Sequence, residues 1–568
     1  MKSIHFLLLC QAMVGASAGN LATLERPTVR VQNGTLGGVF NRHYRQDMFL
    51  GIPYAAPPVE NLRFNKPAPP SPWVGTKDAR SYSAQCLGTS VGLTGFSQKE
   101  NPEEMDEDCL YLNVVRPAGV GRRRKLAVLV WIHGGGWFEG SASDGRYNGT
   151  FLVSSSVKMG KPIVFVSFNY RLGAFGYLSG QEVQKNGIAN LGLQDQRQAL
   201  AWIQENIHSF GGDPKRVTVM GESAGALSIG FHLLAKQGRD EGLFSAAIAQ
   251  SGSTFTPALS RSAAQQQADF EGVLNVTGCA RSKEVLPCLR AIPASKLREA
   301  SKTLPLSFTP DGNLVPRSAL KSLREGKFVR VPLLIGTTRN EGTSFVQQAL
   351  KEPLNTIEDL ATFIQSTWGL GKIPRQILQR LVKLYKKDIK SPAAGLGTVA
   401  PNPNSQLGAQ YGAATLWMGD MMFTAGRRAT NQAWTSFDVP NYSYLFDTVP
   451  ANLNASTLGV AHFQEIPYAF GNSQAVGWET DPFPSEPILR KKYEELAEIM
   501  SRMWISFATT RSPNHHGVQS LNIDWPAYCS ENPRNIVFSA SKGLSLQSDT
   551  WRKQSFDIIF GLSDVGSD

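Results

Sequence analysis

Residues 216–234, RVTVMGESAGALSIGFHLL, decide the fold of this 568-residue chain. A β-branched run at 216–220 ends at the motif GESAG at 221–225, and a stretch rich in small residues follows. Strand, G-x-S-x-G and helix in this order predict a sharp turn that exposes Ser223, with the positive end of the helix dipole beneath it. The flanking glycines are needed because a Cβ atom there would strike the strand or the helix. The alternative is an ordinary turn in which the serine caps a helix.

Further continuous apolar runs predict buried strands at 125–132, 162–168, 244–249 and 331–336. Hydrophobicity without alternation is typical of strands that are covered on both faces. Between the second run and the strand before GESAG, apolar residues of segment 193–207 recur at helical spacing. We therefore expect an α/β fold with a central, mostly parallel sheet flanked by helices. A large helical C-terminal portion, about 345–440, is expected to pack on that sheet.

Composition describes a globular protein with a large core, since 42% of residues are hydrophobic and 18% are charged. No linker, low-complexity tract or repeat divides the chain, so we predict a single domain at 19–568 after a signal peptide at 1–18. The net charge of +11 is moderately basic. The densest cationic cluster, 122–125, is interpreted as a solvated loop. With no basic helix or aromatic-interleaved basic groove recognised, a nucleic-acid partner is not expected.

The first 18 residues have the pattern of a secretory signal peptide. Lys2 precedes an apolar stretch that begins at Phe6, and Ala16-Ser17-Ala18 is an A-x-A cleavage site. That stretch is too short to cross a membrane, and no later segment is long and apolar enough. We therefore expect a secreted protein without a stable membrane anchor.

Cysteines and sequons fit an oxidising, extracellular setting. Removal of the signal leaves five of the six cysteines. The close pairs Cys86 with Cys109 and Cys279 with Cys288 are plausible disulfides, which leaves Cys529 as a free, buried and inert thiol. In a secreted chain, N-x-S/T sequons predict glycans on the surface, here at Asn33, Asn148, Asn275, Asn441 and Asn454.

A serine nucleophile needs a general base and an acid that orients the base. In enzymes with a G-x-S-x-G turn, the chain order is serine, acid, histidine. Of the histidines after Ser223, His232 is too close along the same helix, and His515 and His516 stand in a polar turn. By elimination, His462, in a loop after an expected strand, is the predicted base.

Glu341 is the predicted acid, because it lies just past the buried run 331–336, at the sheet edge where sites form in α/β folds. The residues alone leave other acids open, such as Asp311. The stretch HGGGW at 133–137 follows the first long strand. Its consecutive glycines let backbone N–H groups face a developing oxyanion, and the N–H of Ala224 would be a further donor.

With these motifs in this order, the chain resembles the type-B carboxylesterase/lipase family, which includes cholinesterases and fungal lipases. The resemblance runs from about Arg26 to Phe560, and further landmarks are FLGIPYA at 49–55, EDCLYLN at 107–113, NYRLG at 169–173 and FGGDP at 210–214. It implies an α/β-hydrolase fold and catalysis without a metal or a cofactor. The triad implied is Ser223, Glu341 and His462, and the implied oxyanion donors are Gly135, Gly136 and Ala224.

The resemblance also implies both disulfides and a buried pair between Arg63 and Glu107. One departure is Phe463, because the family usually has a small residue after the catalytic histidine. We expect this ring to narrow the site near the base.

The function implied is a secreted carboxylic ester hydrolase that forms an acyl-enzyme on a small-molecule or lipid ester. The loop between Cys86 and Cys109 forms a lid in family members with lipase activity. Here it is fairly short, and its apolar residues lie in its first half, which favours an esterase on soluble substrates. It has no tryptophan to face a quaternary ammonium, which disfavours a cholinesterase. The alternatives are a lipase on long-chain esters, a dedicated pathway acyltransferase or lactonase, and a non-catalytic cholinesterase-like binding protein; no oligomeric state is predicted.

Overall fold

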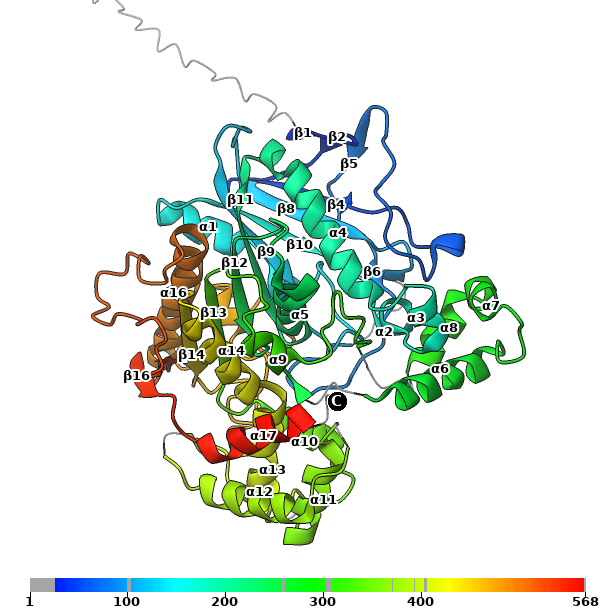
Figure 1. Ribbon diagram of the computed structural model, residues 1–568. Helices are drawn as coiled ribbons and strands as arrows, with labels where there is room; N and C mark the ends of the chain where they lie inside the picture. Colours follow the sequence, from blue (N-terminus) through cyan, green and yellow to red (C-terminus); the bar gives the residue numbers. More distant parts are fainter. Residues whose placement is uncertain are drawn as a thin grey trace, which may run out of the picture.

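The computed structural model describes residues 26–99, 104–257, 261–302, 308–369, 371–392, 394–402 and 406–565, so the predicted signal peptide lies outside the described residues. An 11-stranded sheet forms the centre of the molecule (Figure 1). Its strands, in spatial order, are β16 (Ser545–Ser548), β15 (Arg534–Phe538), β14 (Asn441–Phe446), β13 (Leu333–Thr338), β12 (Ala246–Gln250), β11 (Gly212–Glu222), β9 (Leu126–Ile132), β10 (Ile163–Phe168), β8 (Tyr111–Pro117), β4 (Gln46–Pro53) and β3 (Val39–Asn41).

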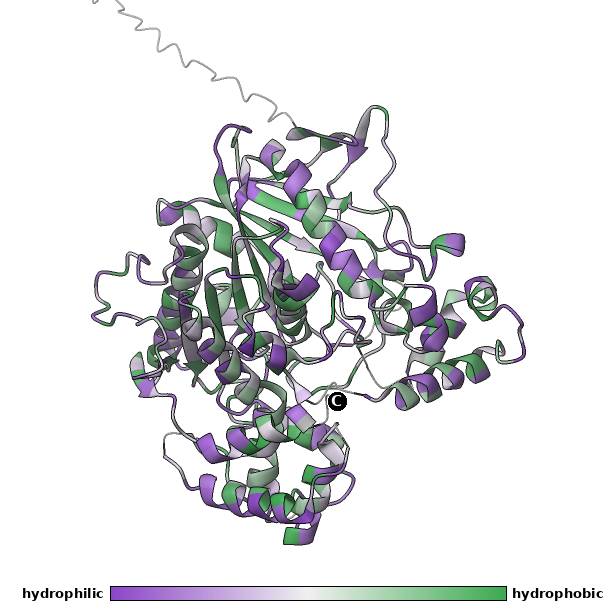
Figure 2. Cartoon of the chain, viewed as in Figure 1, coloured by the Kyte–Doolittle hydropathy of each residue, from purple (hydrophilic) through white to green (hydrophobic). Residues whose placement is uncertain are grey.

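The middle of this sheet is parallel, as predicted. Neighbours pair in parallel from β10 across to β15, whereas β8, β4 and β3 at one edge and β16 at the other pair antiparallel. All of the strands expected from continuous apolar runs are present. Hydrophobic residues concentrate in these central strands, as Figure 2 shows. Smaller elements are a three-stranded sheet of β1 (Thr28–Val31), β2 (Gly34–Gly37) and β5 (Thr76–Asp78), and the pair β6 (Gln85–Cys86) and β7 (Met105–Asp106).

Helices cover both faces of the sheet, which explains the unbroken apolar runs. On β9, Val128 and Val130 pack in the cluster that includes α4 and α5, whereas Leu129 and Trp131 pack with α1 and α16. The helices in the first half of the chain are α1 (Thr150–Lys158), α2 (Gly173–Tyr177), α3 (Gln181–Lys185), α4 (Leu191–Asn206), α5 (Ala224–Gly238), α6 (Ala263–Thr277), α7 (Val285–Ala291) and α8 (Ala294–Ser301).

The C-terminal portion is largely helical, as expected, and α14 packs against β13 and β14. One stretch is unusual, because a π-helical turn at Asp420–Thr424 joins α13 to α14. The helices are α9 (Ala319–Arg324), α10 (Gly342–Ala349), α11 (Ile357–Thr367), α12 (Arg375–Asp388), α13 (Tyr411–Gly419), α14 (Ala425–Ser436), α15 (Ile466–Ala469), α16 (Pro487–Thr510) and α17 (Lys553–Val565). None of the helices in the described ranges combines the length and the apolar character needed to cross a membrane.

Both predicted disulfides, Cys86–Cys109 and Cys279–Cys288, are present. The implied ion pair is also present: Arg63 donates two hydrogen bonds to the Glu107 carboxylate, at 2.7 and 2.5 Å. A third group of the same guanidinium, Nη1, donates to backbone carbonyls at 289, 290 and 292, next to the second disulfide. The pair therefore ties the two disulfide-bonded segments together.

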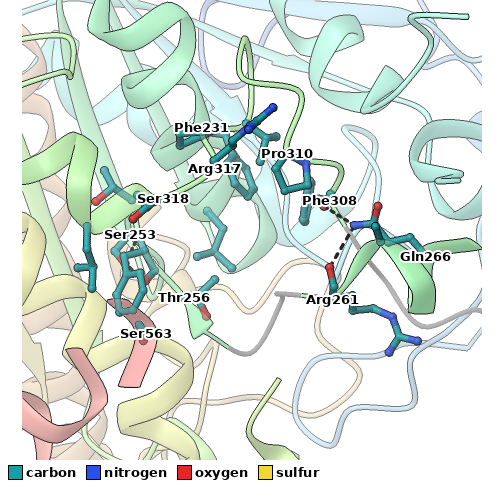
Figure 3. A pocket seen from close by; sticks show the side chains of 18 of the residues that line it. Phe231, Ser253, Thr256, Arg261, Gln266, Phe308, Pro310, Arg317, Ser318 and Ser563 are labelled. Atoms are coloured by element: carbon teal, nitrogen blue, oxygen red, sulfur yellow. Dashed lines mark hydrogen bonds between the residues drawn. The ribbon is translucent and has the colours of Figure 1, made fainter. Parts of the chain in front are cut away.

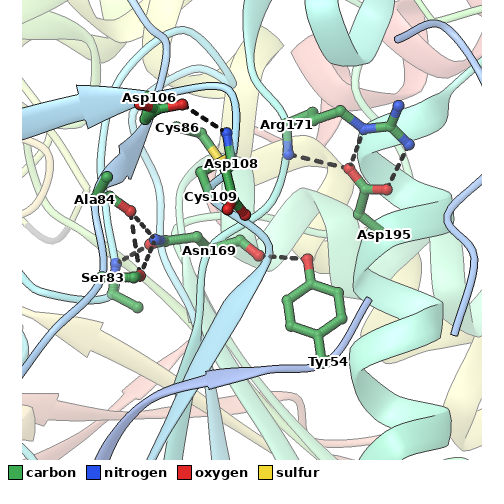
Figure 4. Close-up of a disulfide and its surroundings, with 11 residues drawn as sticks. Tyr54, Ser83, Ala84, Cys86, Asp106, Asp108, Cys109, Asn169, Arg171 and Asp195 are labelled. Atoms are coloured by element: carbon green, nitrogen blue, oxygen red, sulfur yellow. Dashed lines mark hydrogen bonds and ion pairs between the residues drawn. A yellow bond between two sulfur atoms is a disulfide. The ribbon is translucent and has the colours of Figure 1, made fainter. Parts of the chain in front are cut away.

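The NYRLG landmark connects the first disulfide loop to the helical layer (Figure 4). The side-chain amide of Asn169 donates to the backbone carbonyl of Ala84, just before the disulfide. The backbone carbonyl of Asn169 accepts a hydrogen bond from the hydroxyl of Tyr54. Arg171 forms a bidentate pair with the fully buried Asp195 of α4, at 2.7 and 2.6 Å. These bonds fix the backbone just before the loop between Cys86 and Cys109.

Three surface expectations are corrected. Asn441 is only 1% exposed, because it begins the interior strand β14 and its amide donates to Thr435 and Val439; a glycan cannot be attached there. Cys529 is half-buried rather than buried. A basic helix does exist: α12 buries its apolar residues and exposes the cations Arg375, Arg380, Lys383 and Lys387.

Candidate active site

Ser223 stands on the sharp turn between β11 and α5. Its backbone has φ 54° and ψ −123°, a sparsely populated conformation that costs about 1–3 kcal/mol. A Cβ atom on Gly221 would lie 2.7 Å from the carbonyl carbon of Gly225, and one on Gly225 would overlap the carbonyl oxygen of Ile132. The side chain of Ser223 makes no helix-capping hydrogen bond, so the capping alternative is wrong. The hydroxyl is instead presented to a pocket.

The structure brings His462 and Glu341 together. Nδ1 of His462 lies 2.6 Å from Oε2 of Glu341, in an environment where both side chains are about 1% exposed. The other carboxylate oxygen of Glu341 accepts hydrogen bonds from the hydroxyl of Ser251, at 2.6 Å, and from the backbone N–H of Thr338, at 2.7 Å. Three donors thus hold this carboxylate at the end of β13, and Nδ1–H of the imidazole is one of them.

A second carboxyl group contacts the same imidazole from the other side. Oε1 of Glu222 lies 3.1 Å from Nε2 of His462, outside the angular range of a hydrogen bond, and within the described residues neither Glu222 oxygen has a hydrogen-bond partner. Burial, and then the nearby Glu465 and Glu341, raise the pKa of Glu222 well above its ordinary value. This upward shift of the pKa favours the neutral carboxyl form of Glu222 beside the imidazole.

Glu465 completes a buried group of three glutamates. Burial, reinforced by the charge of Glu341, raises the pKa of Glu465 to about 8. Its side chain accepts one hydrogen bond from Gln250, at 3.2 Å, and Trp504 in turn donates to Gln250. Glu465 was not among the predicted site residues. Its position in the mostly apolar segment 460–466 could have predicted that its carboxyl group is buried.

The HGGGW loop reaches the nucleophile, as expected. Gly135 and Gly136 have φ of 98° and 62°, values that favour glycine, and a Cβ atom on Gly135 would overlap the carbonyl oxygen of Glu139. Among the described residues, nothing accepts a hydrogen bond from the backbone N–H groups of Gly135, Gly136 or Ala224. Ala224 is the first residue of α5, where N–H groups lack an intrahelical partner. Three donors are therefore available beside Ser223.

Neighbouring residues fix this loop in place. The ring of His133 stacks on Tyr170 with ring centroids 4.3 Å apart, and burial lowers the pKa of His133 to about 4, which keeps the imidazole neutral. The indole N–H of Trp137 donates to Ser228 of α5, at 2.9 Å. Because α5 starts at the nucleophile, this bond ties the oxyanion loop and the serine to the same helix.

Ser223, His462 and the three N–H donors line one pocket of about 200 Å³. Phe423, from the π-helical turn, stacks on His462 with centroids 4.6 Å apart, and Phe345 of α10 packs against the same ring at 5.1 Å. Most of the remaining lining is apolar and includes Val91, Leu93 and Phe96 of the first disulfide loop. The pocket can therefore bind an apolar group next to the Ser223 hydroxyl, the His462 imidazole and three N–H groups that have no acceptor among the described residues.

The competing candidates lie elsewhere. Asp311 is exposed and accepts hydrogen bonds from three backbone N–H groups of its own turn. His232 is buried against Gln196, and burial lowers its pKa to about 3. Phe463 does not line the pocket, contrary to expectation. It packs on Phe96 and on the guanidinium of Arg146, so it supports the loop beneath the site.

A nucleophile turn at the carboxyl edge of a mostly parallel sheet, with a glycine loop from the neighbouring strand, defines an α/β-hydrolase. The crystal structure of Aspergillus niger EstA superimposes with a TM-score of 0.80 at 28% identity, covering 96% of this chain and 99% of that one. The model of the carboxylesterase family matches residues 25–555.

Curated relatives agree. Secreted lipase 1 of Botryotinia fuckeliana is 32% identical over 94% of this chain and 92% of its own length. Acetylcholinesterase of Electrophorus electricus is 34% identical over 88% of this chain and 83% of its own length. This chain belongs to the carboxylesterase family and is a carboxylic ester hydrolase of the serine type.

Proposed function

We propose that the chain is a secreted esterase in which Ser223 is the nucleophile, His462 the general base and Glu341 the acid that orients it. The single observation that supports this best is the 2.6 Å contact between Nδ1 of His462 and the Glu341 carboxylate, which also accepts hydrogen bonds from Ser251 and Thr338. That contact selects the tautomer with hydrogen on Nδ1 and leaves Nε2 free to accept a proton. Secretion follows from the signal pattern at 1–18, after which 19–568 would form one domain.

In the first step, Nε2 of His462 takes the proton of the Ser223 hydroxyl as Oγ attacks the ester carbonyl carbon. The carbonyl oxygen becomes negative and accepts hydrogen bonds from the N–H groups of Gly135, Gly136 and Ala224, each worth roughly 3 kcal/mol in the transition state. The protonated imidazole then gives its proton to the departing alkoxide. An alcohol leaves, and the acyl group stays on Oγ.

In the second step, His462 removes a proton from water, and the resulting hydroxide attacks the acyl carbonyl. The same three N–H groups stabilise the second oxyanion. Return of the proton from Nε2 to Oγ releases the carboxylic acid and restores the free enzyme. Every proton that His462 takes is handed on within the cycle, so neither a metal nor a cofactor is required.

The first disulfide loop supports a confined esterase pocket. The carboxylate of Glu139 accepts hydrogen bonds from the hydroxyl of Ser97, at 2.6 Å, and from the N–H of Val91, at 3.0 Å. Ser344 and Gln464 donate to the loop carbonyls at 94 and 95. Three separate segments therefore hold the described part of the loop against the site. The apolar side chains of this loop form one wall of the pocket, which supports a substrate that binds inside it over an oil surface.

The test is hydrolysis of p-nitrophenyl esters from acetate to palmitate by the wild type and by Ser223→Ala. We expect the variant to lose about a millionfold in turnover, because the nucleophile is removed. The variant Ser366→Ala, on the exposed face of α11, serves as a control for loss of a serine hydroxyl away from the site. Ordinary turnover by a folded Ser223→Ala protein would refute the assignment.

The second candidate function is a lipase, favoured by the similarity to a protein named secreted lipase 1. The same ester series separates the two. A maximum at long acyl chains, with a rate that rises above the micellar limit, would indicate a lipase. A maximum at short chains would indicate an esterase.

A further inference from the structure

A second cavity, of about 390 Å³, lies beside the catalytic pocket (Figure 3). Leu227 and Thr256 line both cavities. Leu227 is one helical turn after Ser223 on α5, and Phe231, one turn further, lines only the second cavity. The second cavity therefore begins next to the nucleophile and extends along α5.

The shared wall faces away from the base. None of the side chains that contact the imidazole of His462 lines the second cavity, neither the phenylalanines 345 and 423 nor the glutamates 222 and 341. In ester hydrolysis the leaving alcohol must lie near Nε2 to receive its proton, so the acyl part takes the opposite direction. The second cavity therefore adjoins the acyl side of the reacting carbonyl.

The chemistry of its lining differs from that of the catalytic pocket. Ser253, Gln266 and Ser563 already donate to backbone carbonyls, and Arg261 is paired with Asp269 and points away from the cavity in Figure 3. Three polar side chains of the lining make no hydrogen bond within the described residues. These are the amide of Gln184, the hydroxyl of Thr256 at the shared wall, and the exposed guanidinium of Arg317 just before α9, and only Arg317 carries a charge.

We propose that the acyl part of the natural ester extends past Leu227 and Thr256 into this second cavity and carries a carboxylate that binds Arg317. The inference rests on the proposed function, and it names the substrate class: an ester of a dicarboxylic acid rather than of a simple fatty acid. The apolar side chains of Leu227, Phe231 and Phe308 would contact the chain between the two carboxyl groups. The guanidinium of Arg317, which has no ion-pair partner within the described residues, can supply the charge-assisted hydrogen bonds.

The first test compares p-nitrophenyl half-esters of α,ω-diacids with p-nitrophenyl alkanoates of equal chain length, from four to twelve carbons. For the wild type, we expect kcat/KM to favour the half-ester at one chain length. In Arg317→Glu this preference should fall by about tenfold or more. The matched control is Arg380→Glu on α12, which changes an equally exposed arginine that lines neither cavity and keeps the preference.

The second test fills the cavity. Of the two cavities, Ala319 lines only the second. We expect Ala319→Trp to lower kcat/KM for the preferred half-ester by about tenfold relative to p-nitrophenyl acetate, because the larger side chain fills the cavity. The control Ala319→Ser should not lower it. The inference would be overturned by an unchanged half-ester preference in Arg317→Glu, or by an equal fall of that preference in Arg380→Glu. In either case, hydrolysis of p-nitrophenyl acetate that depends on Ser223 would leave the proposed function intact. Absence of hydrolysis of every ester by folded protein would overturn the function, and the inference with it.

Discussion

The two sides of the His462 imidazole are built differently, although a glutamate lies on each side. On one side, Glu341 accepts hydrogen bonds from three donors. On the other side, Glu222 has no hydrogen-bond partner among the described residues, and its burial raises its pKa well above the ordinary value. The two glutamates are the same residue type, so the donors that surround each carboxyl group decide which of them can orient His462.

The largest expected effect comes from replacing the orienting acid. In Glu341→Gln, the amide can present an N–H₂ group to Nδ1 of His462, which favours the wrong tautomer of the imidazole. We expect kcat for p-nitrophenyl acetate to fall by about 10⁴. The control is Glu358→Gln on the exposed surface of α11. A loss smaller than about tenfold would show that the three donors do not define the catalytic acid.

A much smaller effect is expected on the opposite side. Burial raises the pKa of Glu222, which favours its neutral form, and glutamine is a neutral group of similar shape. In Glu222→Gln, we expect kcat at pH 7 to change by less than about tenfold. Steady-state kinetics on the same ester measure this directly. If Glu222→Gln lost as much activity as Glu341→Gln, the two sides of His462 would be equivalent, and the comparison would fail.

The smallest effect concerns stability rather than turnover. The pKa of Glu465 is about 8 in the folded protein, above the ordinary value of 4.5. The stability contributed by its bound proton is fully present below pH 4.5 and is lost as pH rises through 8. Glu465→Gln does not titrate, so we expect its thermal unfolding midpoint to gain on that of the wild type from pH 5 to pH 8.

Glu495→Gln, on the exposed face of α16, is the control for that series. A constant difference between Glu465→Gln and the wild type across the pH range would show that the buried carboxyl group does not keep its proton.

Much of the fold and the catalytic geometry could be predicted because it lies at strand ends. The buried strands are recognisable in the sequence as continuous apolar runs. Ser223, the glycine loop and Glu341 each come shortly after one of these runs. Their proximity is a consequence of parallel strands that end at one edge. The disulfides could be predicted because each joins cysteines that are near in sequence.

What depends on side-chain direction could not be predicted. Phe463 was expected in the site, but its residue has φ 79° and its ring turns toward Arg146 instead. Asn441 lies in a valid sequon, yet the strand that contains it is interior. The second cavity is lined by residues of α5 and α6, of segments 253–256 and 308–320, and of the last turn of α17, and no local sequence pattern predicts that these segments meet.

The number of residues in the π-helical turn at Asp420–Thr424 determines which side chain packs against His462. A π turn holds one residue more than an α turn, and here the extra residue sets the register of Phe423, the ring that stacks on His462. Deleting a single residue from this turn would restore regular helical spacing and rotate Phe423 by about 100° around the helix axis. An insertion or deletion, rather than a substitution, could therefore change the wall beside the base while leaving every catalytic group unaltered.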